Sequence, residues 1–320
     1  IIWILPTQKL EFRRILKTLK IFFVINAIIT TVFFILINIF QIINLDVVWD
    51  LSIQNTVLMK VAGQTWYRTP GIFEIGGTNG TFLLMFLSIS LGKLYYSTQF
   101  SSYSKYIIYI LIISILIFFI VTRRTYLCLL ISVFLFIILK SFKNPTISKI
   151  LFFILTICLM TLSLFIINIK FSGIFSLDSF YDRLQFWYMS LNNIIGNDIG
   201  NLLIGLNILQ SALKHSIMSL YSYSILDNGF IECIMHSGVI FLLLLIIYIC
   251  FLFKDNLELL YMDLDYKYKW IPMTNLFLII NMIILMLFSS FIFNLTESFV
   301  YLFIINYFTK FSINQSIKSK

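Results

Sequence analysis

Apolar runs of membrane-spanning length recur along this chain, with polar connections between them. A hydrocarbon core about 30 Å thick requires roughly 20 apolar residues in a helix. Runs such as IIYILIISILIFFIV are continuous, whereas the strands of a transmembrane barrel alternate between apolar and polar residues. The pattern predicts an all-α polytopic membrane protein with about eight transmembrane helices. We expect them at 21–44, 78–96, 106–121, 126–139, 150–169, 229–253, 272–293 and 298–310.

These spans form one transmembrane domain over residues 1–320, and the longest polar interruption within it is 170–228. Apolar residues recur at helix spacing from Phe180 to Ile195, and a second amphipathic piece covers about 207–220. We therefore expect this loop to contain amphipathic helices that lie on the membrane surface or over the bundle. The chain begins IIWILPTQKL, without an initiator Met, and we expect that an N-terminal part with an earlier span is missing.

The distribution of positive charge predicts the orientation. With a cytoplasmic N-terminus, only seven of the 23 Lys and Arg residues fall in outer connections. They are Lys60, Arg68, Arg123, Arg124, Lys170, Arg183 and Lys214. Cytoplasmic connections carry an excess of Lys and Arg, so this assignment agrees with the positive-inside rule. The loop at 170–228 is then extracytoplasmic.

Composition narrows the class further. Sixty per cent hydrophobic residues and 12% charged residues exclude an ordinary soluble domain. The net charge of +9 follows the predicted topology, so we expect the lipid bilayer and no nucleic acid as a partner. The four cysteines lie in apolar spans without a CxxC motif, which indicates packing residues; we expect no metal and no cofactor.

Arginines at the predicted outer face are the first candidates for chemistry. Arg123 and Arg124 occupy a short turn between two spans, where they can either contact lipid phosphates or clamp a phosphate or pyrophosphate. Arg183 precedes Trp187 by one helical turn and can stack on it, or pair with a nearby aspartate. Arg68 is a further cation that can face the same anionic, lipid-borne ligand.

A second group of candidates lies in and after the loop. His215 can act as acid or base near neutral pH, or be a surface residue. Asp227 and Asn228 open the span at 229, either as an ordinary helix N-cap or to orient a sugar hydroxyl. Glu232 and His236 are four residues apart on one helix face and either serve function or satisfy each other.

Several of these segments together resemble a known family. They are T-R-R-T at 122–125, Arg-x-x-x-Trp at 183–187, L-L-I-G-L at 202–206, His215 with D-N-G-F at 227–230, and R-T-P-G-I-F at 68–73. This set, spread over roughly residues 60–310, resembles the O-antigen polymerase and O-antigen ligase superfamily of the Wzy and WaaL type.

The resemblance implies a multi-pass bacterial inner-membrane glycosyltransferase of the GT-C type, metal-independent and inverting, whose active site faces the periplasm or cell exterior. Its substrate would be an oligosaccharide linked to undecaprenyl pyrophosphate, as in lipopolysaccharide or capsule synthesis. Arg124 and Arg183 would bind the departing pyrophosphate, and His215 would sit near the acceptor. Arg123, which adjoins Arg124, can exchange roles with it. A chain-length regulator and a flippase are the protein partners that the resemblance suggests.

Three functions remain open at this point. The leading expectation is a repeat-unit polymerase that joins lipid-linked oligosaccharides. A ligase that attaches the finished glycan to a lipid or protein is the nearest alternative. A flippase or transporter of the same lipid-linked sugar is a third, although the two related halves with interrupted helices that many transporters show are not found. The sequence contains no P-loop, HExxH or GxSxG motif.

Overall fold

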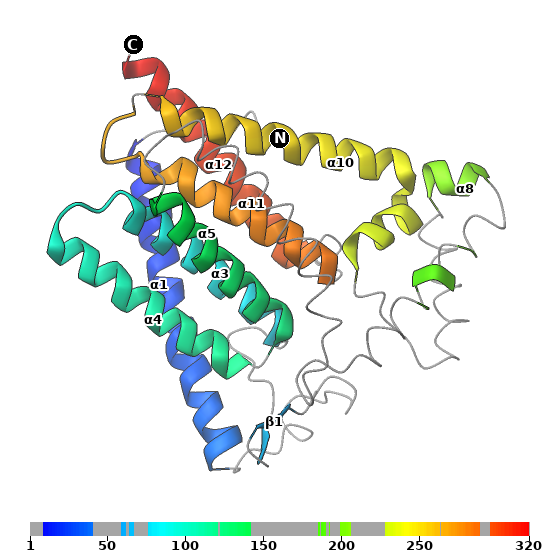
Figure 1. Ribbon diagram of the computed structural model, residues 1–320, viewed down its shortest axis with the longest axis horizontal. Coiled ribbons are helices and arrows are strands. Elements are labelled where there is room, and N and C mark those ends of the chain that lie inside the picture. Colours follow the sequence, from blue (N-terminus) through cyan, green and yellow to red (C-terminus); the bar gives the residue numbers. More distant parts are fainter. Residues whose placement is uncertain are drawn as a thin grey trace.

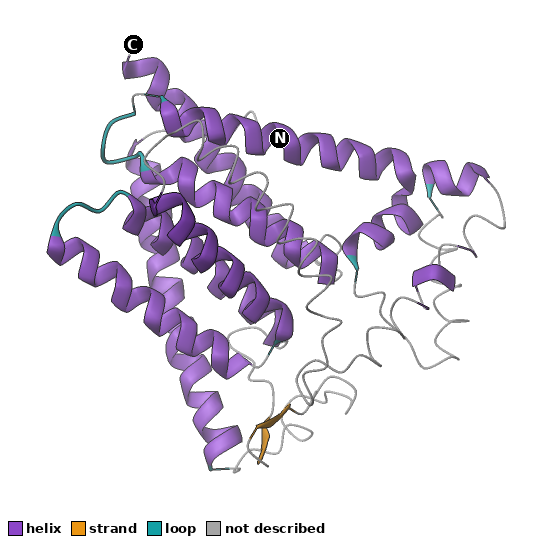
Figure 2. Ribbon diagram, viewed as in Figure 1, coloured by secondary structure: helices purple, strands orange, loops and turns teal. Residues whose placement is uncertain are grey.

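The computed structural model describes most of the predicted spans. The described residues are 9–40, 59–61, 64–66, 76–120, 122–141, 185, 187–189, 192, 199–205, 228–262, 264–288 and 295–319. Each predicted span overlaps a helix except 150–169, which lies outside these residues, as do the last residues of the spans at 21–44 and 272–293. Figure 2 shows the helices and one short hairpin in the predicted polar connection before 78.

The helices follow each other along the chain as α1 (Lys9–Phe34), α3 (Gly76–Tyr95), α4 (Phe100–Ile120), α5 (Arg123–Ser141), α8 (Ile199–Ile204), α10 (Gly229–Tyr261), α11 (Trp270–Phe288) and α12 (Leu295–Ser319). A short π-helical turn, η2 (Ile35–Ile39), continues α1. Strands β1 (Met59–Val61) and β2 (Gln64–Trp66) pair antiparallel, with Met59 opposite Trp66. The apolar pattern did not predict this hairpin.

Several helices are longer than the hydropathy pattern predicts: α1 begins at Lys9, within the predicted basic stretch before the span, and α10 and α12 also extend beyond their predicted ends. Residues 254–261, expected in a charged connection, continue α10, because Asn256 and Leu259 remain buried while Lys254 and Glu258 pair on the exposed face. The last span, expected at 298–310, is a helix of 25 residues. Its extension carries polar side chains that face the protein, such as Ser312 and Gln315, so hydropathy falls before the helix ends.

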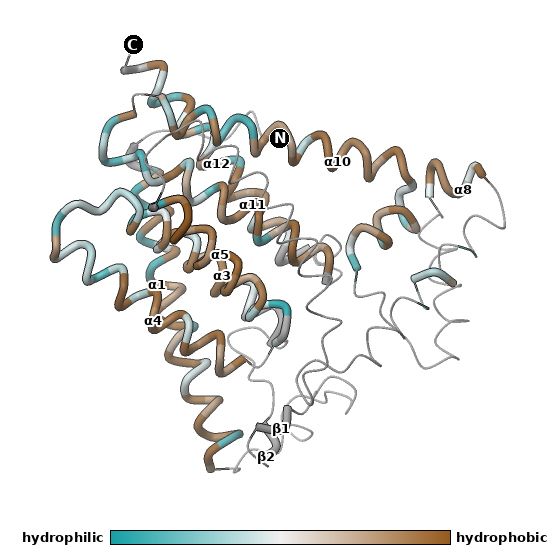
Figure 3. Tube along the Cα trace, in the orientation of Figure 1, coloured by the Kyte–Doolittle hydropathy of each residue, from teal (hydrophilic) through white to brown (hydrophobic). Residues whose placement is uncertain are grey.

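Four helices in the described part are long and apolar enough to cross a membrane: Glu11–Ile39, Phe100–Ile120, Gly229–Tyr261 and Trp270–Leu287. Apolar side chains on α1, α4 and α10 point away from the protein, for example Ile28, Leu111 and Leu244 at 58%, 58% and 60% exposure. Figure 3 shows these helices to be predominantly hydrophobic along their length. Such exposed apolar surface indicates a membrane protein, in which lipid covers these faces.

Helices α3 and α11 form the centre of the bundle, packed against each other and against α5 (Figure 1). Gly92 explains how closely they approach: a Cβ there would lie 2.2 Å from Thr274 Oγ1 and 2.9 Å from the carbonyl oxygen of Trp270. Small residues of this kind allow helix backbones to come together in a membrane, where no hydrophobic effect drives the association.

Three groups of hydrogen bonds between buried polar side chains join the helices, each centred on one asparagine. Asn79 links α3 to α1, accepting from Asn26 at 2.7 Å and donating to Thr30 at 2.9 Å. Asn281 of α11 accepts from Ser132 of α5 and donates to Ser88 of α3. Asn275 of α11 donates to Asn256 of α10 and Thr309 of α12. Each such bond contributes on the order of 0.6 kcal/mol in a membrane protein and sets the register of the helices.

The connections separate into two ends of the bundle. The beginning of α1, the α3–α4 connection, the α10–α11 connection and the C-terminus lie at one end (Figure 1). The beginnings of α3, α5 and α10 lie toward the other end, near α8. We call the first the basic end. We call the second the arginine-turn end, after residues 122–125, the arginine turn, which contain Arg123 and Arg124. They correspond to the sides predicted to be cytoplasmic and extracytoplasmic.

Candidate functional site

The arginine turn is held rigidly at the beginning of α5. Thr122 caps the helix: its carbonyl oxygen accepts from Tyr126 N at 3.3 Å and from Thr125 Oγ1 at 2.8 Å, and the two threonine hydroxyls also bond to each other. On α3, Gly80 packs against these threonines, since a Cβ there would lie 2.3 Å from Thr125 Cγ2. The turn is therefore fixed against the most buried part of the protein.

Both arginines belong to the first turn of α5, because the helix begins at Arg123. The four-residue turn expected at 122–125 is thus shorter than predicted. Cations in the first turn of a helix oppose its dipole, at a cost of roughly 0.3–1 kcal/mol each at an exposed position. Helix stability therefore does not account for this pair, whereas an anion would be favoured there by the guanidinium groups and by the helix N-terminus together.

Arg124 is partly buried, and only the backbone of Arg123 is described. The side chain of Arg124 is therefore partly covered by the rest of the protein. This position suits a fixed cation, because a side chain held by its neighbours loses less entropy when it binds a ligand.

The beginning of α10 is capped by Asn228. Its Oδ1 accepts hydrogen bonds from Phe230 N at 3.0 Å and Ile231 N at 3.2 Å, and its carbonyl oxygen accepts from Glu232 N at 3.1 Å. The N-cap interpretation of this residue is therefore confirmed. Asp227, the other predicted residue of the pair, lies outside the described residues.

Glu232 and His236 lie one turn apart in the first segment of α10. Glu232 is 6% exposed, while His236 is partly buried. A carboxylate in the first turn of a helix is favoured by the dipole. The two side chains share a helix face, as their spacing predicts, and both lie at the arginine-turn end.

Immediately after His236, α10 bends at Gly238. This residue has φ 78° and ψ 172°, a conformation that side-chain-bearing residues rarely adopt. Gly205, at the end of α8, has φ 87°. The two glycines touch: a Cβ on Gly205 would lie 2.5 Å from Gly238 N, and one on Gly238 would lie 2.1 Å from the carbonyl oxygen of Leu203.

This glycine contact joins part of the L-L-I-G-L segment of the sequence resemblance to the helix that carries Glu232 and His236. Residues 202–205 are docked through Gly205 onto the backbone of His236 and Ser237. Sequence reasoning missed the bend, because the run from 229 to 253 predicts one uninterrupted span. The signal that was available is the Ser-Gly pair at 237–238, a common place for a helix to bend.

Several other predicted site residues cannot be placed relative to Arg124, Glu232 and His236. Arg68, Arg183 and His215 lie outside the described residues, as does the piece at 207–220. Part of the predicted amphipathic segment is described: Trp187 is buried at 9% exposure, whereas Tyr188, expected on the same apolar face, is 66% exposed. The described residues contain no group of three His, Cys, Asp or Glu side chains that could hold a metal.

Comparison with known proteins adds no relative. No protein-family model matches the chain, and no curated protein matches it.

Proposed function

We propose that the protein is a membrane glycosyltransferase that polymerises oligosaccharide repeat units carried on undecaprenyl pyrophosphate. The observation that carries this proposal is the arginine turn, in which Arg123 and Arg124 belong to the first turn of a helix whose start packs through Thr122 and Thr125 against Gly80. A helix N-terminus with added cations suits an anionic phosphate group. The docking of residues 202–205 beside His236 supports a site built from several parts of the chain.

In the proposed reaction, an acceptor hydroxyl of one lipid-linked unit attacks the anomeric carbon of another. The new carbon–oxygen glycosidic bond forms as the bond between that carbon and the pyrophosphate oxygen breaks. Undecaprenyl pyrophosphate leaves with the electron pair, and the acceptor proton passes to a base and then to water. Negative charge grows on the leaving group, so Arg124, together with Arg183 from the outer loop, would stabilise the transition state electrostatically. His215 is the proposed base, with Glu232 and His236 near the acceptor.

The proposal is tested first by arginine substitutions in cells that lack the native gene. Arg124→Ala should abolish glycan elongation, a loss of at least about 100-fold, while the protein accumulates normally in the membrane. Arg183→Ala should have the same effect. Arg124→Lys keeps the charge but loses the planar fork, so it should retain partial activity. Lys254→Gln is the matched control, since it removes an exposed cation at the other end of the bundle.

Gel analysis of the glycans then separates the functions. Single repeats in the deletion strain identify a polymerase, whereas long chains that accumulate on undecaprenyl pyrophosphate identify a ligase. If no repeat reaches the outer face, the protein is a flippase. Normal chain lengths in both arginine-to-alanine variants would refute the proposed clamp.

A further inference from the structure

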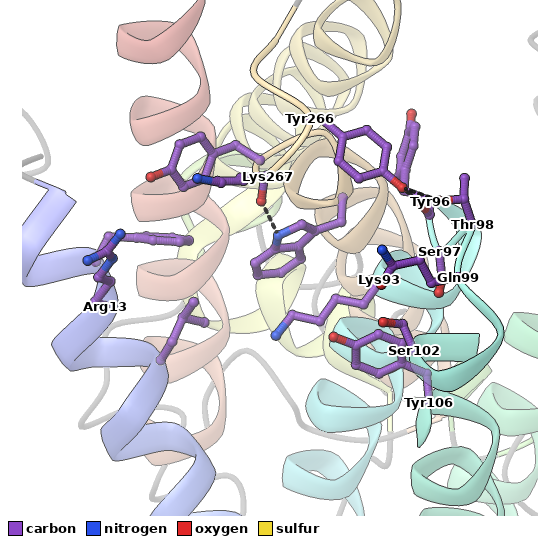
Figure 4. A pocket seen from close by; sticks show the side chains of 14 residues that line it. Arg13, Lys93, Tyr96, Ser97, Thr98, Gln99, Ser102, Tyr106, Tyr266 and Lys267 are labelled. Atoms are coloured by element: carbon purple, nitrogen blue, oxygen red, sulfur yellow. Dashed lines mark hydrogen bonds between the residues drawn. The ribbon is translucent and has the colours of Figure 1, made fainter. Parts of the chain in front are cut away.

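A separate cavity of about 450 Å³ opens at the basic end of the bundle. Its walls come from the beginning of α1, the connection between α3 and α4, and the connection between α10 and α11 (Figure 4). These segments are far apart in the sequence and meet only in the folded protein. The cavity lies at the end of α3 that carries Lys93, whereas Gly80 and the arginine turn lie at its beginning, so the cavity is distinct from the site proposed above.

Three cations from three segments line this cavity: Arg13 of α1, Lys93 of α3 and Lys267 of the α10–α11 connection. No carboxylate is among the residues that line it. Asp265 lies close by, but its Oδ1 accepts from the backbone N of Lys267 at 3.2 Å. The cavity wall is thus positively charged among the described residues, and opposite charge from a ligand would be attracted to it.

Lys93 is the central cation. Its side chain runs across the cavity toward α1, which carries Arg13 (Figure 4). The Nζ atom lies 4.6 Å from the ring centroid of Trp270 and 5.9 Å from that of Tyr106. Lys93 is partly buried, forms no ion pair with a described carboxylate, and is repelled by Lys20 and Lys105. Aromatic contacts hold the ammonium group in place, but they do not neutralise its charge.

Hydrogen-bond donors surround the same space. The hydroxyl of Ser97 is buried and has no hydrogen-bond partner in the described part of the chain. Gln99 and Ser102 flank the beginning of α4, where the first backbone N–H groups of that helix are not used within it. A buried hydroxyl without a partner is unfavourable, and a bound hydrogen-bond acceptor would relieve that cost.

The cavity lies close to where the exposed apolar faces of α1 and α4 begin. On α1, Arg13 precedes the exposed Ile21 by a little over two helical turns, or about 12 Å along the axis. On α4, Ser102 precedes the exposed Ile108 by about 9 Å. The apolar faces of both helices therefore begin just below the cavity, as expected of a site at the membrane–water boundary.

We propose that this cavity binds a phosphate group, with Lys93 and Arg13 as its principal ligands and Ser97 as a hydrogen-bond donor. The position at the membrane boundary favours the headgroup of an anionic phospholipid from the adjacent leaflet. A soluble phosphate compound offers the same chemistry, and the experiment distinguishes these two sources.

The test uses the full chain, purified in detergent and titrated by native mass spectrometry. The lipid probe is dihexanoylphosphatidylglycerol, the zwitterionic control is dihexanoylphosphatidylcholine, and the soluble probe is inorganic pyrophosphate. Lys93→Gln should weaken binding of the anionic lipid at least about fivefold. Arg13→Gln changes an exposed residue, and it should weaken binding similarly. Lys254→Gln, which removes an exposed cation outside the cavity, should leave binding unchanged.

Each result has a defined meaning. Binding of the anionic lipid that depends on Lys93 and Arg13 supports a lipid headgroup site. Binding of pyrophosphate with the same dependence, without the lipid, supports a phosphate site filled from solution. The proposal is overturned if neither probe distinguishes the variants from the wild type. It is also overturned if Lys254→Gln weakens binding as much as Lys93→Gln, or if phosphatidylcholine binds as tightly as phosphatidylglycerol.

Discussion

The two ends of this helical bundle both concentrate positive charge, but they do so in different ways. At the arginine-turn end, Arg123 and Arg124 come from one helix start, whose threonines, Thr122 and Thr125, pack against Gly80 of α3. At the basic end, Arg13, Lys93 and Lys267 come from three segments and converge on a cavity. Basic residues are expected at a cytoplasmic end for topological reasons, whereas cations at an outer helix start oppose both topology and the helix dipole.

This difference shows how far charge alone can identify a site. The cations at the basic end would have been attributed entirely to membrane orientation from their sequence positions. Their convergence on one cavity, beside an unsatisfied hydroxyl, is the reason to expect a ligand there. At the arginine-turn end, the sequence alone indicates function. Two adjacent arginines there conflict with the positive-inside rule.

The largest expected effect tests whether the two ends lie on opposite sides of the membrane. Gln99 is exposed at the basic end and Tyr188 is exposed in the predicted outer loop. Gln99→Cys should react with a membrane-impermeant maleimide only after the cytoplasmic membrane is permeabilised, whereas Tyr188→Cys should react in intact spheroplasts. The wild type, with its own cysteines, is the blank. Equal labelling of both variants in intact spheroplasts would disprove the predicted topology.

Next in size is a comparison between the two glycines of α3. A Cβ at Gly92 would meet the Trp270 carbonyl oxygen at 2.9 Å, a backbone atom that cannot move without shifting α11. A Cβ at Gly80 would meet mainly the Thr125 side chain, at 2.3 Å. We expect Gly92→Ala to destabilise the protein by about 3 kcal/mol and Gly80→Ala by about 1–2 kcal/mol.

Thermal unfolding of the purified variants in detergent measures this difference. Gly80→Ala should in addition reduce glycan elongation out of proportion to its effect on stability, because it displaces the turn that carries Arg124. A Gly80→Ala variant with full elongation activity would separate the arginine turn from the proposed chemistry. Equal destabilisation by both substitutions would show that Thr125 is as immobile as the α11 backbone.

The smallest expected effect concerns the cap of α10. Asn228→Ala removes the acceptor for two backbone N–H groups and should destabilise the protein by about 1 kcal/mol. Asn228→Asp retains an acceptor at the same place and should be close to the wild type in thermal unfolding. If Asn228→Asp matches the wild type in stability but loses elongation, then the residue has a second role in binding substrate. Equal stability of Asn228→Ala and the wild type would argue against the cap as a stabilising interaction.

Most helices and one local interaction were predictable from the sequence. The spans follow from the number of consecutive apolar residues that a membrane requires, and the Asn228 cap follows from a short-range preference at a helix start. The extension of α10 and α12 was not predictable from hydropathy, because Asn256, Ser312 and Gln315 are polar but buried against neighbouring helices. Arg124 was identified as a candidate from its position alone, whereas its place in the first turn of α5 required the structure.

What the sequence by itself determined is therefore the membrane-embedded helical class and the places where charge breaks the expected pattern. Tertiary structure alone decided the docking of Gly205 on Gly238, the close approach of Gly92 to α11, and the cavity around Lys93. The physical reason is common to all three. Each depends on contacts between backbones or side chains that are distant along the chain, and local propensity carries no information about such contacts.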